Sequence, residues 1–142
     1  MLIWNPSKLT TKGKALLAKA QAGRCTIKIT KAQTGSGQYS SGEATDTRTS
    51  LKAPVQTLTI HSKEIQNGST LVLKVAITNK TSDTDVLKSG YEIREFGIFA
   101  QDPDDGEILY SIATASTSDY MPAYNGVIPS VIYMSYYLEV AN

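Results

Sequence analysis

The spacing of apolar residues changes once along this chain, and this change limits the possible folds more than any other feature. Up to about residue 22 the apolar positions recur with the 3.6-residue period of a helix. They form one stripe of Leu9, Gly13, Leu16, Leu17 and Ala20. From Thr26 onward the period is two, because Ile27 and Ile29 alternate with polar neighbours. The sequence therefore predicts one N-terminal helix followed by strands.

The expected helix covers about residues 10–22. Thr10 or Thr11 can cap its start, and Gly23 can adopt the left-handed conformation common just after a helix. Gly13 lies within the apolar stripe, where glycine costs about 1 kcal/mol of helix stability relative to alanine. Such a glycine usually indicates the close approach of another backbone.

The remaining sequence predicts a mainly β fold, an antiparallel β-sandwich of about six or seven strands. The clearest hairpin joins residues 55–65 to residues 70–78, because Asn67-Gly68 supplies the positive φ angles of a tight turn. Two further strands are expected at residues 91–100 and 131–140, where apolar side chains occur at both odd and even positions. This pattern is typical of a strand that is covered on both faces or that contains a bulge. Shorter strands are expected at residues 26–30 and 108–115. The length of 142 residues, with no repeat and no linker, predicts one domain over residues 1–142, with the sandwich at about 26–140.

Composition excludes several classes of protein. The single cysteine permits neither an internal disulfide nor a Cys-rich metal site. No apolar run approaches the ~18–20 residues of a membrane-spanning helix. The first residues, Met1–Pro6, lack the basic leader and the apolar length of a secretory signal. We therefore expect a soluble chain that is made in the cytoplasm.

No group of residues predicts catalysis, a metal site or a cofactor site. His61 has neither a cysteine nucleophile nor a nucleophile-elbow motif to accompany it, so we expect a surface or interface histidine. The acidic turn Asp102–Glu107 does not have the spacing of a calcium-binding loop and is predicted to be a solvated hairpin turn. Gly35-Ser-Gly37 lacks the helix and the Lys-Ser/Thr pair of a phosphate loop, which favours a flexible turn.

One acidic residue flanked by apolar ones and one long polar segment are expected to matter for structure more than for chemistry. Glu95 is the charged residue most closely flanked by apolar ones. Either a bulge turns it outward, or it is buried and hydrogen-bonded to a lysine or to backbone amides, and a structural role is favoured over a binding role. Residues 34–50 are rich in Gly, Ser and Thr, with Tyr39 as the only bulky anchor, which predicts a mobile or partner-ordered loop.

The formal charge of +1 hides an uneven distribution along the chain. Residues 1–52 hold nine Lys/Arg and two Asp/Glu, whereas residues 53–142 hold five Lys/Arg and eleven Asp/Glu, giving net charges of +7 and −6. A docking or self-assembling domain could use this difference between neighbouring copies, or folding could bring the two halves together within one molecule. Lysines and aromatics are segregated along the sequence, which argues against a nucleic-acid partner.

The last predicted strand carries tyrosines on a face of its own. Tyr133 and Tyr137 lie on one side of this strand with Val131 and Ser135, and the alternate residues Ile132, Met134, Tyr136 and Leu138 lie on the other. Because one face can enter the core, the tyrosine face either belongs to a central strand covered on both sides or serves as a protein–protein interface.

Three segments resemble the N-terminal domain of phage tail fibre and tail-collar fibre proteins. They are Leu9–Gly23, Tyr91–Tyr110 and Asp119–Pro122, in the order of that family and distributed along the whole chain. The resemblance implies a virion structural domain that docks a fibre or receptor-binding protein onto the tail baseplate. Such fibres are usually trimers and are not enzymes, and similar modules occur in phage-tail-like bacteriocins. Family members usually continue into a shaft and a tip, whereas this sequence ends at Asn142, as a fragment or an adaptor for another fibre chain would.

The resemblance thus implies a homotrimeric attachment domain in a virion tail or tail-like particle. Its partners would be baseplate or other tail proteins and a distal fibre chain, without nucleic acid and without membrane insertion. We expect no catalytic residue, cofactor or metal. The residues expected to make contacts are Lys8, Lys12, Lys19, Tyr39, Tyr133 and Tyr137. The alternative is a β-sandwich carbohydrate-binding module that uses the aromatics between Tyr110 and Tyr137, notably Tyr120 and Tyr124.

Overall fold

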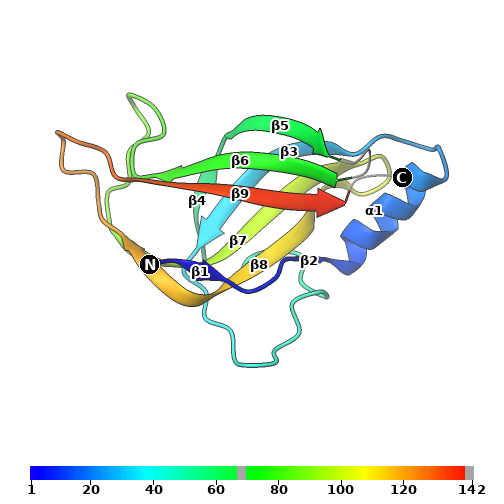
Figure 1. Ribbon diagram of the computed structural model, residues 1–142, viewed down its shortest axis with the longest axis horizontal. Helices are drawn as coiled ribbons and strands as arrows, with labels where there is room; N and C mark the ends of the chain where they lie inside the picture. Colours follow the sequence, from blue (N-terminus) through cyan, green and yellow to red (C-terminus); the bar gives the residue numbers. More distant parts are fainter. Residues whose placement is uncertain (67–69, 140–142) are drawn as a thin grey trace.

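Two antiparallel β-sheets pack face to face, with the helix at one end (Figure 1). The computed structural model describes residues 1–66 and 70–139. In chain order, the elements are β1 (Ile3–Trp4), β2 (Lys8–Leu9), α1 (Thr11–Gln21), β3 (Lys28–Gly35), β4 (Pro54–Leu58), β5 (Ile60–Gln66), β6 (Thr70–Thr78), β7 (Tyr91–Asp102), β8 (Gly106–Met121) and β9 (Val131–Glu139). This confirms the predicted fold class, an N-terminal helix followed by an antiparallel, mainly β structure.

The larger sheet has the strand order β1-β8-β7-β3-β4, with β2 also paired to β8, and the smaller sheet has the order β5-β6-β9. Of the nine strands in the described residues, β1 and β2 are only two residues long. They pair with β8 on either side of the segment 5–7, and the amide of Asn5 donates to the carbonyl of Thr114 at 2.8 Å. The N-terminal segment therefore forms one edge of the larger sheet.

The chain passes from one sheet to the other between β4 and β5, which corrects the expectation of one strand over residues 55–65. Leu58 pairs with Ala32 in the larger sheet, and Ile60 pairs with Val75 in the smaller one. Both side chains contribute to the same core, so the alternation of apolar residues continues across the crossing. The predicted pairing of β5 with β6 is confirmed, while the Asn67-Gly68 turn lies outside the described residues.

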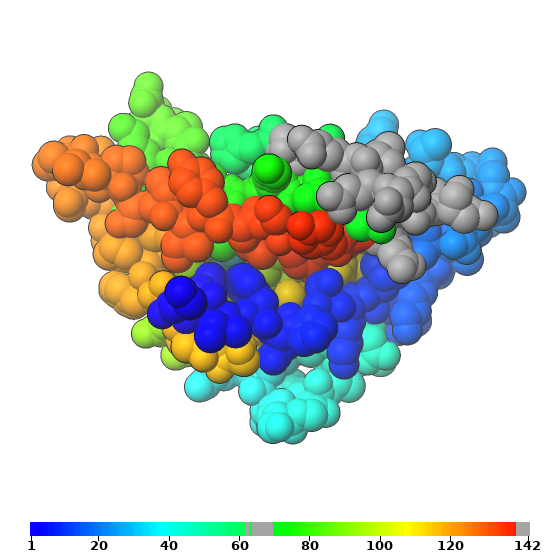
Figure 2. Space-filling model, viewed as in Figure 1, coloured from blue at the N-terminus to red at the C-terminus, as the bar shows by residue number. Residues whose placement is uncertain are grey.

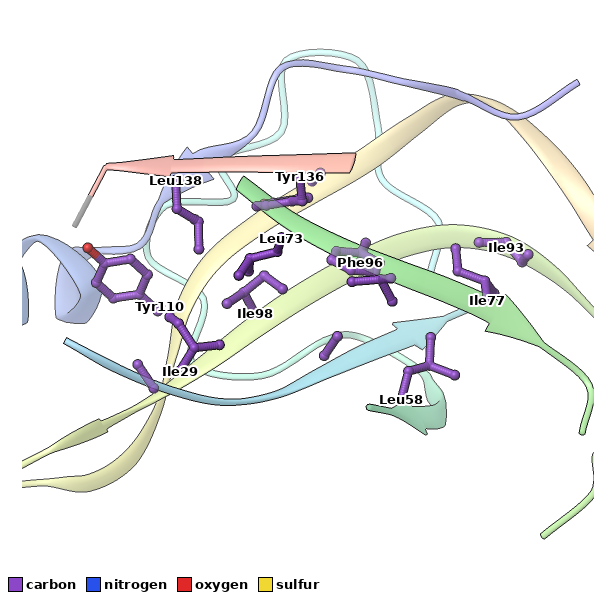
Figure 3. Close-up of a cluster of buried hydrophobic side chains, with 14 of the residues drawn as sticks. Ile29, Leu58, Leu73, Ile77, Ile93, Phe96, Ile98, Tyr110, Tyr136 and Leu138 are labelled. Carbon is purple, nitrogen blue, oxygen red and sulfur yellow. The ribbon is translucent and has the colours of Figure 1, made fainter. Parts of the chain in front are cut away.

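The main core lies between the two sheets, and Figure 3 shows its central side chains. Phe96 of β7 stacks on Tyr136 of β9 with ring centroids 5.1 Å apart, and Trp4 approaches the same Phe96 edge-on at 5.9 Å. A smaller apolar cluster covers the opposite face of the larger sheet, where Leu51 packs with β7 and β8. Strand β7 thus has apolar neighbours on both faces and contains register shifts, which explains its apolar residues at both parities.

Helix α1 begins and packs as its sequence predicts. The Thr10 hydroxyl accepts a hydrogen bond from the amide of Gly13 at 2.9 Å and so caps the helix, while Gly23 has a φ of 79°. A Cβ on Gly13 would overlap the carbonyl oxygen of Tyr110 in β8. The glycine therefore permits the predicted close approach of another backbone. Among the described residues, no helix has the length and apolar character needed to cross a membrane.

Gly13→Ala should destabilise the protein although alanine is the better helix former. The added methyl group must displace a backbone carbonyl, and overpacking of this kind costs about 1–3 kcal/mol. The propensity gain of about 1 kcal/mol offsets part of that cost. We expect a lower urea midpoint for Gly13→Ala, measured by circular dichroism. Ala18→Gly at an exposed position of the same helix is the control for propensity alone; a more stable Gly13→Ala protein would contradict the packing argument.

Candidate docking surface

The acidic turn between β7 and β8 forms ion pairs with the basic N-terminal part of the chain. Lys19 Nζ lies 2.8 Å from carboxylate oxygens of both Asp102 and Asp104. Three further pairs join the same regions: Lys12–Asp105 at 3.4 Å, Arg24–Asp104 at 3.5 Å and Lys31–Glu107 at 3.1 Å. Folding therefore brings the oppositely charged halves together within one molecule. This places Lys12 and Lys19, two of the expected contact residues, in intramolecular ion pairs.

Asp102 is the buried centre of this cluster, with only 1 % of its surface exposed. Its Oδ1 also accepts a hydrogen bond from the amide of Asp104 at 2.8 Å, so the turn is anchored from both sides. Hydrogen bonding to Lys19 lowers the pKa of the Asp102 carboxyl, and hydrogen bonding to Asp102 and Asp104 raises the pKa of Lys19. The hairpin turn is exposed to solvent at residues 103–105, as the sequence predicted, and its buried Asp102 in addition anchors the turn to the helix through Lys19.

Glu95 is completely buried, and its carboxylate accepts four hydrogen bonds from the loop that connects β3 and β4. Oε2 accepts from the amides of Gly37 at 2.9 Å and Ala53 at 2.8 Å. Oε1 accepts from the amide of Lys52 at 2.9 Å and from the Tyr39 hydroxyl at 2.5 Å. The structural role predicted for Glu95 is thus filled by backbone amides and a phenol, which together satisfy both carboxylate oxygens.

The Gly35-Ser-Gly37 motif allows the loop to approach this carboxylate. A Cβ at either glycine would lie 2.5 Å from Oε2 of Glu95. Glycine is therefore required by close contact with a side chain of the same molecule, and the motif is not simply a flexible turn. Contacts within the chain also hold the segment that the sequence predicted to be mobile or ordered by a partner.

Tyr39, another expected contact residue, is engaged in the same network. Its ring lies 4.4 Å from Lys52 Nζ, and its hydroxyl donates to Glu95. Burial, followed by the hydrogen bond to Glu95, raises the pKa of the Tyr39 phenol far above its ordinary value. Tyr39 therefore fixes the loop, and only its outer surface remains for a partner.

Tyr133 and Tyr137 are on the outer face of β9, with 81 % and 56 % of their surfaces exposed. The alternate residues of the strand are directed into the core, where the Tyr136 hydroxyl is 2.7 Å from Ser111 Oγ and links the two sheets. Among the described strands, β9 pairs only with β6, so it is an edge strand of its sheet. The structure thus favours the interface interpretation of the tyrosine face over a central strand covered on both sides. Figure 2 shows β9 at the surface beside the N-terminal segment.

Two grooves border this strand. A groove of about 1410 Å³ lies between the N-terminal segment, the loop at residues 38–46 and the end of β9, and it is lined by Lys8, Tyr39 and Tyr137 among others. A second groove of about 720 Å³ lies against the outer face of the smaller sheet, beside His61 and Tyr133. The structure therefore brings three of the six expected contact residues to one groove and Tyr133 to the other.

The most exposed aliphatic pair in the described residues was not predicted from the sequence. Val127 and Ile128, in the connection between β8 and β9, are 74 % and 71 % exposed. The available signal was the turn dipeptide Asn125-Gly126 directly before two branched aliphatic residues. Within the described residues, no cluster of three or more metal-ligating side chains is found.

The aromatic residues of the carbohydrate-binding alternative are dispersed by the fold. Tyr110 and Tyr136 are buried in the core. Tyr124 packs against Lys80, whose Nζ lies 5.3 Å from the ring centroid. Neither Tyr120 nor Tyr124 lines either of the two grooves.

These features define the class as a mainly β domain whose exposed apolar side chains are concentrated on β9 and the connection before it. The sequence model of the family described as phage tail-collar fibre protein, N-terminal, matches residues 6–142. The chain belongs to this family and is a structural tail fibre component of a virion. Neither the curated proteins nor the solved structures contain a match to the chain.

Lys19→Met should remove the part of the stability that depends on the ionisation of Asp102. The folded-state pKa of Asp102 is lowered from an ordinary value of about 3.9. Its contribution is therefore present above about pH 4 and is lost as the pH falls through the folded-state pKa. We expect a lower urea midpoint for Lys19→Met at pH 7, with a smaller difference from the parent protein below pH 4. Lys14→Met, exposed on the same helix, should show neither effect; equal pH profiles for all three proteins would contradict the anchor.

Glu95→Gln should destabilise the protein strongly, because the amide group would place hydrogen-bond donors against backbone donors. Each buried donor left without an acceptor costs about 1–3 kcal/mol, which predicts a loss of about 3 kcal/mol. Tyr39→Phe should cost less, about 1.5 kcal/mol, because it removes one hydrogen bond to a charged group. Urea unfolding followed by tryptophan fluorescence measures both. Glu92→Gln, on the same strand and partly exposed, is the matched control. A Glu95→Gln midpoint equal to that of the control would show that the network is dispensable.

Proposed function

We propose that this domain attaches a tail fibre or receptor-binding protein to the baseplate of a phage or phage-tail-like particle. The observation that carries the proposal is the exposed tyrosine face of β9 in a chain of the tail-collar fibre family. Tyrosine combines a large apolar ring with a polar tip, and it is enriched in the central contacts of protein interfaces. An edge strand with such a face is suited to packing against another protein.

The distribution of charge supports a contact made mainly by this face. The acidic turn is occupied by Lys12, Lys19, Arg24 and Lys31 of the same chain. The difference in charge between the two halves is thus largely neutralised within the fold. Apolar and tyrosine contacts, which salt screens little, would then hold the partners together, so assembly should depend weakly on ionic strength.

The proposed assembly is a homotrimer with baseplate or other tail proteins on one side and a distal fibre chain on the other. The domain acts by binding alone, without enzymatic activity, nucleic acid or membrane insertion. It is made in the cytoplasm of the bacterial host and incorporated into the tail. Family membership supports the general role, and the exposed residues support the route of attachment.

A double variant, Tyr133→Ala with Tyr137→Ala, should lower incorporation into tail particles by at least about tenfold. Two truncated interface tyrosines of about 1 kcal/mol each are sufficient for this loss. The amount of chain in sedimented particles is measured by immunoblot, and immunogold labelling shows whether it lies at the baseplate. Tyr120→Ala is the matched control, because Tyr120 is 55 % exposed at the end of β8.

Equal incorporation of the double variant and the parent chain would refute attachment through β9. A glycan array provides the second measurement. Binding of a glycan by the parent chain, with loss on Tyr120→Ala or Tyr124→Ala, would instead support the carbohydrate-binding alternative.

A further inference from the structure

The connection between β8 and β9 presents its two most exposed aliphatic side chains at a fixed tip. In Figure 1 this connection projects beyond the sheets, at the end of the molecule opposite α1. The Asn125 side-chain oxygen accepts hydrogen bonds from the amides of Val127 at 2.8 Å and Ile128 at 3.0 Å. Gly126 has a φ of 86°, which favours glycine at this turn. The backbone under Val127 and Ile128 is therefore held by local hydrogen bonds.

The base of the same connection is clamped by Asn79, which is 2 % exposed. Its side-chain oxygen accepts from the amide of Ser130 at 2.9 Å, and its side-chain amide donates to the carbonyl of Pro122 at 3.0 Å. One buried side chain thus ties together the two ends of the segment 122–130. A tip that is ordered in the free chain loses little conformational entropy on binding, so it is suited to insertion into a partner.

A groove that could receive this tip lies on the same molecule. The groove of about 720 Å³ follows the outer face of β6 and β9, and its lining is mainly apolar. Six of the residues that line it are His61, Lys74, Ala76, Thr78, Val131 and Tyr133. The chain therefore carries both an exposed aliphatic projection and an exposed groove whose apolar side chains are bordered by polar ones such as Lys74 and Lys80.

We propose that the Val127–Ile128 tip of one copy inserts into the groove beside Tyr133 of a second copy. When each copy inserts its tip into the next copy, and does not exchange tips reciprocally with a single partner, the contact is head-to-tail and a suitable rotation closes it into a ring. The proposal rests on the self-association included in the proposed function and names the surfaces that make it. A second copy is favoured over another occupant because each molecule supplies both complementary parts, and because Val131 continues the apolar surface from the tip into the groove.

Disulfide trapping between two separately tagged chains tests the contact directly. Both chains carry Cys25→Ser, which removes the native cysteine; one also carries Ile128→Cys and the other Tyr133→Cys. Under mild oxidation the mixture should yield at least tenfold more cross-linked pairs than either chain alone. Val55→Cys, exposed on β4, replaces Tyr133→Cys in the matched control and should give no product above background.

A second variant measures association without a cross-link. Val127→Ser with Ile128→Ser should reduce the self-association of the full chain by at least tenfold, measured by light scattering over a concentration series. Val55→Ser should leave association unchanged. Thermal unfolding at low concentration checks that all variants are folded, which is expected because the replaced side chains are exposed.

The outcomes separate this contact from the proposed attachment role. The proposed insertion of the tip is contradicted if the parent chain stays monomeric, or if the chain associates equally well after the tip substitutions. Cross-linking of Tyr133→Cys with itself overturns the head-to-tail arrangement. Incorporation of a strictly monomeric chain into tail particles would overturn this contact and leave attachment intact. Specific cross-linking without incorporation would support this contact while the attachment role fails.

Discussion

The buried carboxylate of Glu95 determines where the longest connection of the fold can lie. Strand β7 supplies the carboxylate, and the segment 36–53 supplies three backbone amides and a phenol that donate hydrogen bonds to it. A carboxylate removed from water is tolerable only when its hydrogen bonds are complete, so the loop and the strand must be placed together. With the loop in place, Leu51 covers the second apolar face of the larger sheet. One charged group thus couples loop position to the burial of apolar surface.

Local features of this network could be predicted from sequence, but its assembly could not. Periodicity identified the helix, and the misplaced glycine at position 13 correctly indicated a neighbouring backbone. Both signals come from residues that are close together in the sequence, within one or two turns of the helix. Glu95 and Gly37 are far apart in sequence, so neither residue by itself indicates the hydrogen bond between them. Glu95 appears only as an acid among apolar residues, and Gly37 only as part of a glycine pair that lacks a phosphate-binding motif. The crossing from β4 to β5 was hidden for a related reason, since Leu58 and Ile60 keep the same alternation while entering the core from different sheets.

The candidate surface was predictable to the extent that strand parity decides which side chains face outward. Parity placed Tyr133 and Tyr137 on one face, and that face is exposed in the structure. The lysines followed no comparable rule, because a long flexible side chain finds its partner only after folding. Lys19 reaches Asp102 and Asp104, and the charge division along the sequence becomes a contact between the helix and the β7–β8 turn.

A few buried polar side chains therefore hold the connections of this fold in place, while a small set of apolar side chains remains exposed. Glu95 fixes one long connection, Asp102 fixes a turn against the helix, and Asn79 closes the connection between β8 and β9. In each case a buried polar side chain orders backbone that has no regular secondary structure. Because these contacts form within one chain, the backbone that carries the exposed aliphatic residues is held in place without a partner. Rigid apolar groups lose little entropy on association, so a small domain of this kind can bind through a few side chains at its edge.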